Sequence, residues 1–165
     1  MPTRAWAAAE EEWQFGVSAG GARVAADGAS PLGAIVGVDA QYGFNDAWAA
    51  RAAVEAAWLE RVNQDAVVRV GHAALGITYS LDVLRLLPFV EGSVCVLGVG
   101  GGVADKRSDV GLQVGLGADY LLNPRYSVGL IGRYTYLPVQ LTGSDTFGET
   151  PQLATVSLRV SYRVF

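Results

Sequence analysis

The chain has 165 residues, of which 51% are apolar and 17% are charged, a composition that excludes intrinsic disorder and fits one domain. The formal net charge is −4 and Lys106 is the only lysine, so no basic stripe could neutralise nucleic-acid phosphates. The longest charge-free runs, such as Gly92 to Ala104, are shorter than the roughly 18 residues that indicate a membrane-spanning helix. Nucleic acid is therefore not an expected partner.

The first residues do not have the pattern of a secretion signal. Met1 to Glu12 lacks a positively charged segment followed by an apolar one, so no intact signal peptide is predicted. We expect residues 1–12 to be a flexible N-terminal segment and residues 13–165 to form one folded domain. If the protein is exported, this is a mature form with an added Met.

Strict alternation marks the first two predicted strands. The odd positions are apolar in residues 13–20, and the even positions are apolar in residues 32–44. Period-two alternation is typical of a strand with one apolar face. Asp, Gly, Ser and Pro residues between Ala25 and Pro31 indicate a loop that joins these strands.

The third segment, Trp48 to Arg61, gives conflicting signals. It is rich in alanine, which favours a helix. On a helical wheel, however, Arg51 and Glu55 fall in the middle of the apolar arc, whereas period two separates these charges from Val54 and the tryptophans. We therefore predict a strand.

Five further segments alternate in the same way. Residues 66–81 change phase near Gly71, because Val68 and Val70 are even whereas Leu75 and Ile77 are odd, and this change predicts a β-bulge at the glycine. The other four predicted strands are residues 86–100, 109–120, 126–136 and 154–164.

The connections between the eight strands differ in length. Short turns are predicted at 45–47, 82–85 and 121–125, and longer polar loops at 25–31, 61–65, 101–108 and 139–151. Short turns at one rim and longer loops at the other are typical of transmembrane barrels. The predicted fold class is therefore all-β, an eight-stranded antiparallel up-and-down transmembrane β-barrel with both termini at the short-turn rim.

The bulk of the side chains determines which face points outward. One face carries most of the large residues, and the other is largely Gly, Ala and Ser with a few charges. The interior of an eight-stranded barrel is only just large enough for side chains to fill, so the bulky face must contact lipid. We predict that its aromatic residues form girdles at the two membrane interfaces: Trp13, Tyr42, Phe44, Trp48, Trp58, Tyr79, Tyr120, Tyr126, Tyr136 and Tyr162.

The last strand carries a family resemblance. From Ala154 onward, Val and Leu side chains and Tyr162 alternate with Thr, Ser and Arg, and the chain ends on Phe165. This end resembles the terminal strand of small bacterial outer-membrane barrels of the OmpA, OmpX and OmpW type, although Phe165 is out of phase with Tyr162 and Val164. The resemblance covers about Trp13 to Phe165 and implies an integral outer-membrane protein.

Eight charged residues have inward parity, four of each sign. Buried charge is costly unless it is paired, so equal numbers predict an ion network that plugs the lumen. A gate that opens for ions is the alternative, and the small lumen favours the plug. The predicted network consists of Asp39, Arg51, Glu55, Glu91, Asp119, Arg133, Arg159 and Arg163.

The first short turn restricts the strand register. Phe44 and Trp48 must share the outward face, which places them opposite each other around a three-residue loop. Gln41 then faces Arg51, and Asp39 faces Ala53, diagonal to Arg51. Asp39 is the predicted first partner of Arg51. Glu55 is left for arginines across the lumen, such as Arg133 or Arg159.

No catalytic, metal or cofactor site is predicted. His72 is the only histidine, which excludes a metal cluster of histidines within one chain. A nucleophilic pair of Cys95 and His72 is the alternative, and a small buried thiol is the preferred interpretation. Gly98 to Gly102 superficially resembles a dinucleotide-binding loop, but no helical segment follows it.

We predict a non-enzymatic outer-membrane protein with a structural or interaction role. The alternatives are a narrow pore or an OmpW-like conduit for small apolar molecules, and, with less support, a lipid-modifying enzyme. The expected partners are membrane lipid and the barrel-assembly machinery, and the barrel is expected to be a monomer.

Overall fold

A computed structural model of the chain describes residues 12–25, 32–60, 67–100, 107–142 and 152–164. The segment predicted at 1–12 lies outside these residues except for Glu12, and so do Phe165 and most of the longer predicted loops. The strands are β1 (Trp13–Ala25), β2 (Leu32–Gly43), β3 (Trp48–Glu60), β4 (Val67–Ser80), β5 (Leu86–Gly100), β6 (Arg107–Leu121), β7 (Tyr126–Thr142) and β8 (Gln152–Val164). The described residues contain no helix with the length and hydropathy that crossing a bilayer requires.

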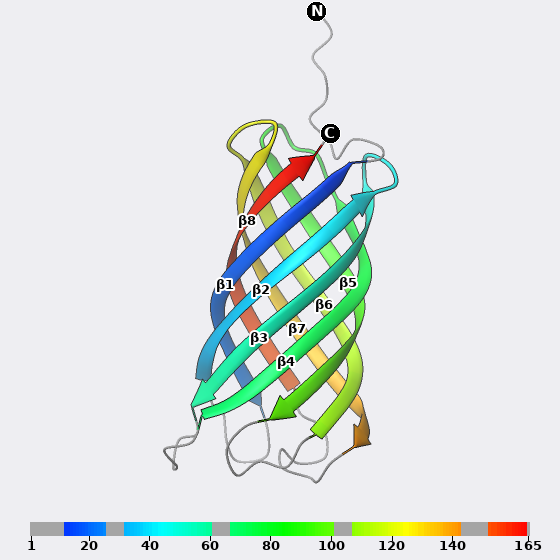
Figure 1. The fold of residues 1–165 in the computed structure, drawn as a ribbon. Coiled ribbons are helices and arrows are strands. Elements are labelled where there is room, and N and C mark those ends of the chain that lie inside the picture. The colour runs from blue at the N-terminus through cyan, green and yellow to red at the C-terminus, as the bar shows by residue number, and fades with distance from the viewer. Residues whose placement is uncertain (1–11, 26–31, 61–66, 101–106, 143–151, 165) are drawn as a thin grey trace, which may run out of the picture.

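The eight strands close into an antiparallel barrel (Figure 1). Each strand pairs with its sequence neighbours, and β1 also pairs with β8 from Trp13↔Val164 to Ala25↔Gln152. The start of β1, the end of β8 and the three short turns share one rim, which we call the short-turn rim. The predicted fold class is confirmed.

β3 is a strand despite its alanine content. Its inward side chains are buried from Arg51 to Leu59, while Val54 and Trp58 face outward. The strand pairs along its length with β2 and β4, so tertiary pairing overrides helix propensity here. Leu59 is apolar but shares the inward face of β3 with Arg51 and Glu55, and its side chain is buried in the lumen.

The β-bulge predicted at Gly71 is wrong. Gly71 pairs in regular register with Ala56 on β3 and with Gly98 on β5. Val68 and Val70 point inward and are buried, so the change of phase reflects a change in what fills the lumen rather than an extra residue. The register irregularities lie instead between β6 and β7, at Ser108/Asp109 and Val110/Leu112.

Most side chains in the lumen are apolar at the end opposite the short-turn rim. The side chains there come from the parts of seven strands near the longer connections, and the sequence analysis did not identify them as a group. We call this set the apolar cluster: Ala22, Val24, Ile35, Ala57, Leu59, Val68, Val70, Ala74, Cys95, Leu97, Val99, Leu137 and Leu153.

Large apolar side chains cover the outer surface of the barrel. Aromatic residues lie near both ends of the strands on this surface, and several are in contact across neighbouring strands. Ring centroids are 5.1 Å apart for Trp13 and Tyr42, 4.8 Å for Trp48 and Tyr79, and 5.0 Å for Tyr126 and Tyr162. We call the aromatic residues at the short-turn rim the short-turn aromatic band: Trp13, Phe15, Tyr42, Phe44, Trp48, Tyr79, Tyr120, Tyr126 and Tyr162.

Two outward-facing valines of β8 are expected to lie at different depths in the membrane. Val160 and Val164 expose similar fractions, 48% and 43%, but Val164 ends the strand at the rim. We expect Val160→Arg to lower the free energy of unfolding in lipid vesicles by about 2–4 kcal/mol and Val164→Arg by about 0–1 kcal/mol, because the cost of a charge falls toward the interface. Equal losses in urea unfolding would contradict the difference in membrane depth assigned to the two valines.

Candidate functional site

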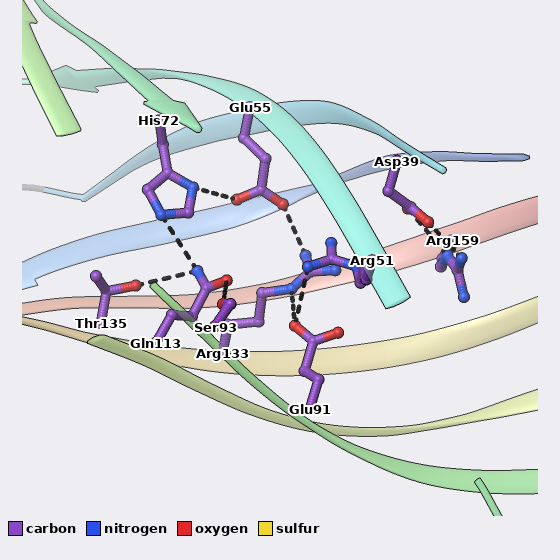
Figure 2. A network of polar contacts seen from close by, with 10 residues as sticks. All are labelled: Asp39, Arg51, Glu55, His72, Glu91, Ser93, Gln113, Arg133, Thr135 and Arg159. Carbon is purple, nitrogen blue, oxygen red and sulfur yellow. Dashed lines mark hydrogen bonds and ion pairs between the residues drawn. The ribbon is translucent and has the colours of Figure 1, made fainter. Parts of the chain in front are cut away.

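The centre of the lumen contains a first ion group, built around Arg133 of β7 (Figure 2). Arg133 Nη1 donates to Glu55 Oε1 on β3 at 2.7 Å, and Arg133 Nε donates to Glu91 Oε1 on β5 at 2.6 Å. Arg51 Nη1 lies 3.4 Å from the same Glu91 oxygen. One guanidinium thus joins two carboxylates, and Arg51 adds a longer contact. We call this set the Arg133 group.

A second ion group is built around Arg159 of β8. Its guanidinium forms a two-point contact with Asp39 of β2, through Nε to Oδ1 at 3.1 Å and through Nη2 to Oδ2. Arg159 Nη1 also donates to Asp119 Oδ2 on β6 at 3.0 Å. We call these three residues the Arg159 group. Two-point arginine–carboxylate contacts are among the stronger charge-assisted hydrogen bonds in proteins.

His72 extends the Arg133 group (Figure 2). On the inward face of β4 it lies between Val70 and Ala74 of the apolar cluster. Its Nδ1 lies 3.2 Å from Glu55 Oε2, and its Nε2 lies 3.4 Å from the amide nitrogen of Gln113. With Gln113 as donor, a neutral His72 accepts at Nε2 and donates from Nδ1 to Glu55. Gln113 also donates to Thr135 at 3.1 Å and accepts from Ser93 at 3.2 Å. Both ring nitrogens of His72 therefore have partners.

The predicted contact between Arg51 and Asp39 is wrong, although the register behind it is correct. Gln41 does face Arg51, and Asp39 does face Ala53. Asp39 is bound by Arg159 instead, and Arg51 lies beside Glu91. Barrel closure explains the difference, because it places β8 two strands from β2, with only β1 between them.

Glycines on neighbouring strands make room for the four carboxylates. Gly16 of β1 separates Asp39 from Arg159, and a Cβ atom there would lie 2.7 Å from Asp39 Oδ1 and from Arg159 Nε. A side chain at this position would therefore push the pair apart. Three more glycines would meet a carboxylate side chain in the same way: Gly37 with Glu55, Gly115 with Glu91, and Gly129 with Asp119.

All eight residues of the predicted network are buried, with at most 7% of their surface exposed. The structure joins seven of them in the two ion groups. Glu55 contacts Arg133, one of the two arginines predicted for it, and not Arg159. Arg163 lies nearer the short-turn rim, where Glu12, Asp82 and Asp119 act on it electrostatically.

The sequence analysis missed neutral polar residues that belong to the same lumen. Gln14 donates to Ser161 at 2.7 Å, and the hydroxyl oxygens of Ser161 and Ser127 are 2.6 Å apart. Thr135 and Ser93 join the network through Gln113. Their inward parity was the available signal, but parity alone does not say which of them meet.

The structure does not bring Cys95 and His72 together as a nucleophilic pair. Cys95 is a buried free thiol in the apolar cluster, whereas the hydrogen bonds of His72 go to Glu55 and Gln113. Among the described residues, no group of three or more His, Cys, Asp or Glu side chains could hold a metal ion.

Comparisons with known proteins identify the family of this chain. The family model described as "Outer membrane protein beta-barrel domain" matches residues 1–163. The chain belongs to this family. The comparison with curated proteins yields no match.

Several solved outer-membrane barrels have the same fold as this family member. Neisserial surface protein A is 18% identical with a TM-score of 0.74, over 93% of this chain and 99% of that one. Ail, the attachment invasion locus protein of Yersinia pestis, is 16% identical with a TM-score of 0.60, over 94% and 99%. OprG of Pseudomonas aeruginosa is 14% identical with a TM-score of 0.60, over 94% and 98%. At these identities the likeness establishes a shared fold.

The two ion groups of this outer-membrane barrel should differ in how much they depend on one arginine. Arg159→Ala leaves two buried carboxylates without their partner and should lower the free energy of unfolding by about 3–5 kcal/mol. Arg51→Ala should cost less, because Glu91 keeps Arg133 and the Arg51 contact is the longer one, at 3.4 Å. Urea unfolding in detergent micelles measures both.

A triple variant provides the control. Adding Asp39→Asn and Asp119→Asn to Arg159→Ala removes the unpaired charges and should restore part of the lost stability. Equal losses for the two single arginine variants would contradict the assigned pairing.

Proposed function

We propose that the protein is an integral outer-membrane barrel with a closed lumen and a structural or interaction role. The ion pairs that cross the lumen carry this proposal. Glu55 and Arg133 come from β3 and β7, which lie four strands apart around a ring of eight. Arg159 likewise links Asp39 of β2 to Asp119 of β6. Such links occupy the path that a solute would take.

The apolar cluster also favours a closed lumen, because it adds a second layer of side chains beyond the ion groups. A cavity of about 10 Å³ remains at that end, lined by apolar side chains together with Asp109 and Gln152. This volume corresponds to about one water molecule. A hydrated ion would have to displace both the ion groups and the apolar side chains.

Neither alternative function has a specific observation in its favour. The cavity that the described residues form in the apolar cluster is too small for a small apolar molecule, so it does not support a conduit. A lipid-modifying enzyme would require an accessible nucleophile, and both His72 and Cys95 are buried. We therefore propose that the protein is not an enzyme.

The outer surface supports membrane lipid as the main partner. Its exposed side chains include Val17, Leu75, Val94, Leu116 and Leu158, spread around the barrel. Because β1 pairs with β8, the sheet has no edge left to pair with another chain, which favours a monomer. We also propose that the barrel-assembly machinery inserts the protein and that nucleic acid is not a partner.

Membrane integration predicts a requirement for detergent or lipid. A closed barrel pairs its backbone groups internally and resists unfolding, so unheated and boiled samples should migrate differently on a denaturing gel. The comparison needs only the wild-type chain, extracted in detergent. A monodisperse monomer in detergent-free buffer would contradict the proposed location.

A closed lumen predicts that the wild-type protein does not conduct ions in planar bilayers. The Arg51→Ala variant should not conduct ions either, because Arg133 still crosses the lumen and the apolar cluster remains. It should unfold at a lower urea concentration than the wild type. If the network were a gate, Arg51→Ala would raise conductance. Single-channel recording with both proteins separates a plug from a gate.

A further inference from the structure

The β4–β5 turn differs from the other two short turns. In those turns an asparagine side chain, Asn45 or Asn123, accepts two backbone hydrogen bonds. The β4–β5 turn is instead a two-residue turn, closed by Val83 and Leu86, which exchange hydrogen bonds at 3.1 Å. Leu84 occupies its first central position with φ of 63°, where a type II′ turn prefers glycine.

Leu84 is also the most exposed large apolar residue described, at 85%. A left-handed leucine is strained, and glycine would adopt the same backbone without that cost. The fold of the turn therefore gives no reason for a leucine here. Its neighbours Leu81, Val83 and Leu86 are exposed as well. Leu86 pairs with Tyr120 of the short-turn aromatic band, so this apolar turn lies at the membrane interface of the proposed barrel.

A cleft of about 290 Å³ lies between this turn and the β6–β7 turn. Its wall is formed by Arg85 and by Leu121, Leu122, Asn123 and Pro124. The backbone of Arg85 is tied to this wall, because Leu121 N donates to Arg85 O at 2.8 Å. Leu122 is exposed, so one side of the cleft continues onto the apolar outer surface.

Two exposed arginines lie at this cleft or directly beside it. Arg85 lines the cleft and Arg125 follows its last wall residue, and both are exposed. Within the part of the chain that the structure describes, neither forms an ion pair. The cleft thus presents two exposed arginines beside apolar surface.

We propose that this cleft binds the headgroup of an anionic phospholipid from the leaflet at the short-turn rim. Arg85 and Arg125 would bind the phosphate, and the acyl chains would run along Leu122 and Leu86. Leu84 would insert into the same leaflet, which accounts for a strained, exposed leucine. A lipid fits better than free phosphate, because the cleft opens onto apolar surface. The inference rests on the proposed membrane location.

Native mass spectrometry of the detergent-solubilised barrel tests this site, with phosphatidylglycerol and phosphatidylcholine as competing probes. The wild-type protein should retain phosphatidylglycerol preferentially. The double variant Arg85→Gln, Arg125→Gln should bind it about tenfold more weakly, because two exposed charge contacts are lost. The matched control is Arg23→Gln, Arg69→Gln, which removes two exposed arginines near the opposite rim and should bind like the wild type.

Leu84→Gly tests the apolar contribution. It should unfold at the same or a higher urea concentration, because strain is relieved, and should still bind phosphatidylglycerol more weakly than the wild type does. The site is refuted if the arginine variant binds like the wild type, if both lipids bind equally, or if inorganic phosphate displaces the lipid. Failure of the wild-type protein to enter lipid vesicles would contradict the membrane location instead.

Discussion

Closure of the sheet at eight strands is the constraint on which the rest of the structure depends. The β1–β8 pairing removes both sheet edges. With eight strands, the lumen is so narrow that the inward side chains fill it. Charged groups in so narrow a space cannot keep their hydration, so they must pair with one another. The carboxylates fit because glycines such as Gly16 and Gly115 lie beneath them on neighbouring strands. The small residues on the inward face thus provide the space that the ion network needs.

The same diameter explains the two layers of the lumen. Near its centre, long arginine side chains reach opposite walls and hold carboxylates from several strands. Toward the longer connections, leucine and valine side chains such as Leu59, Leu137 and Val70 fill most of the space, and Asp109 is a buried carboxylate among them. His72 and Gln113 lie where the layers meet. Their hydrogen bonds to Glu55 and Thr135 let the polar layer end without an unpaired charge.

Alternation along the strands was enough to predict the architecture. It identified eight strands, assigned β3 as a strand against its alanine content, and placed Gln41 opposite Arg51. These features depend on which face a residue occupies and on how long a turn is, and both can be read locally. Family membership agrees with the resemblance seen in the last strand.

Two kinds of information could not be read from alternation. A hydrophobic inward residue breaks the polar pattern, so Val68 and Val70 gave a false bulge at Gly71 and concealed the apolar cluster. Cross-lumen partners depend on closure and on side-chain length rather than on register between neighbours. For this reason Asp39, which lies diagonal to Arg51 on the adjacent strand, is bound by Arg159.

The ion groups also oppose the main folding error open to such a barrel. A one-residue slip in the register of a strand moves every side chain of that strand to the other face. For β7, a slip would turn Arg133 toward lipid and leave Glu55 and Glu91 without their shared partner. An arginine at the bilayer midplane alone costs about 2–4 kcal/mol. An apolar lumen throughout would tolerate the same slip, because apolar side chains are accepted on both faces. The charged centre therefore specifies the register that the apolar layer leaves open.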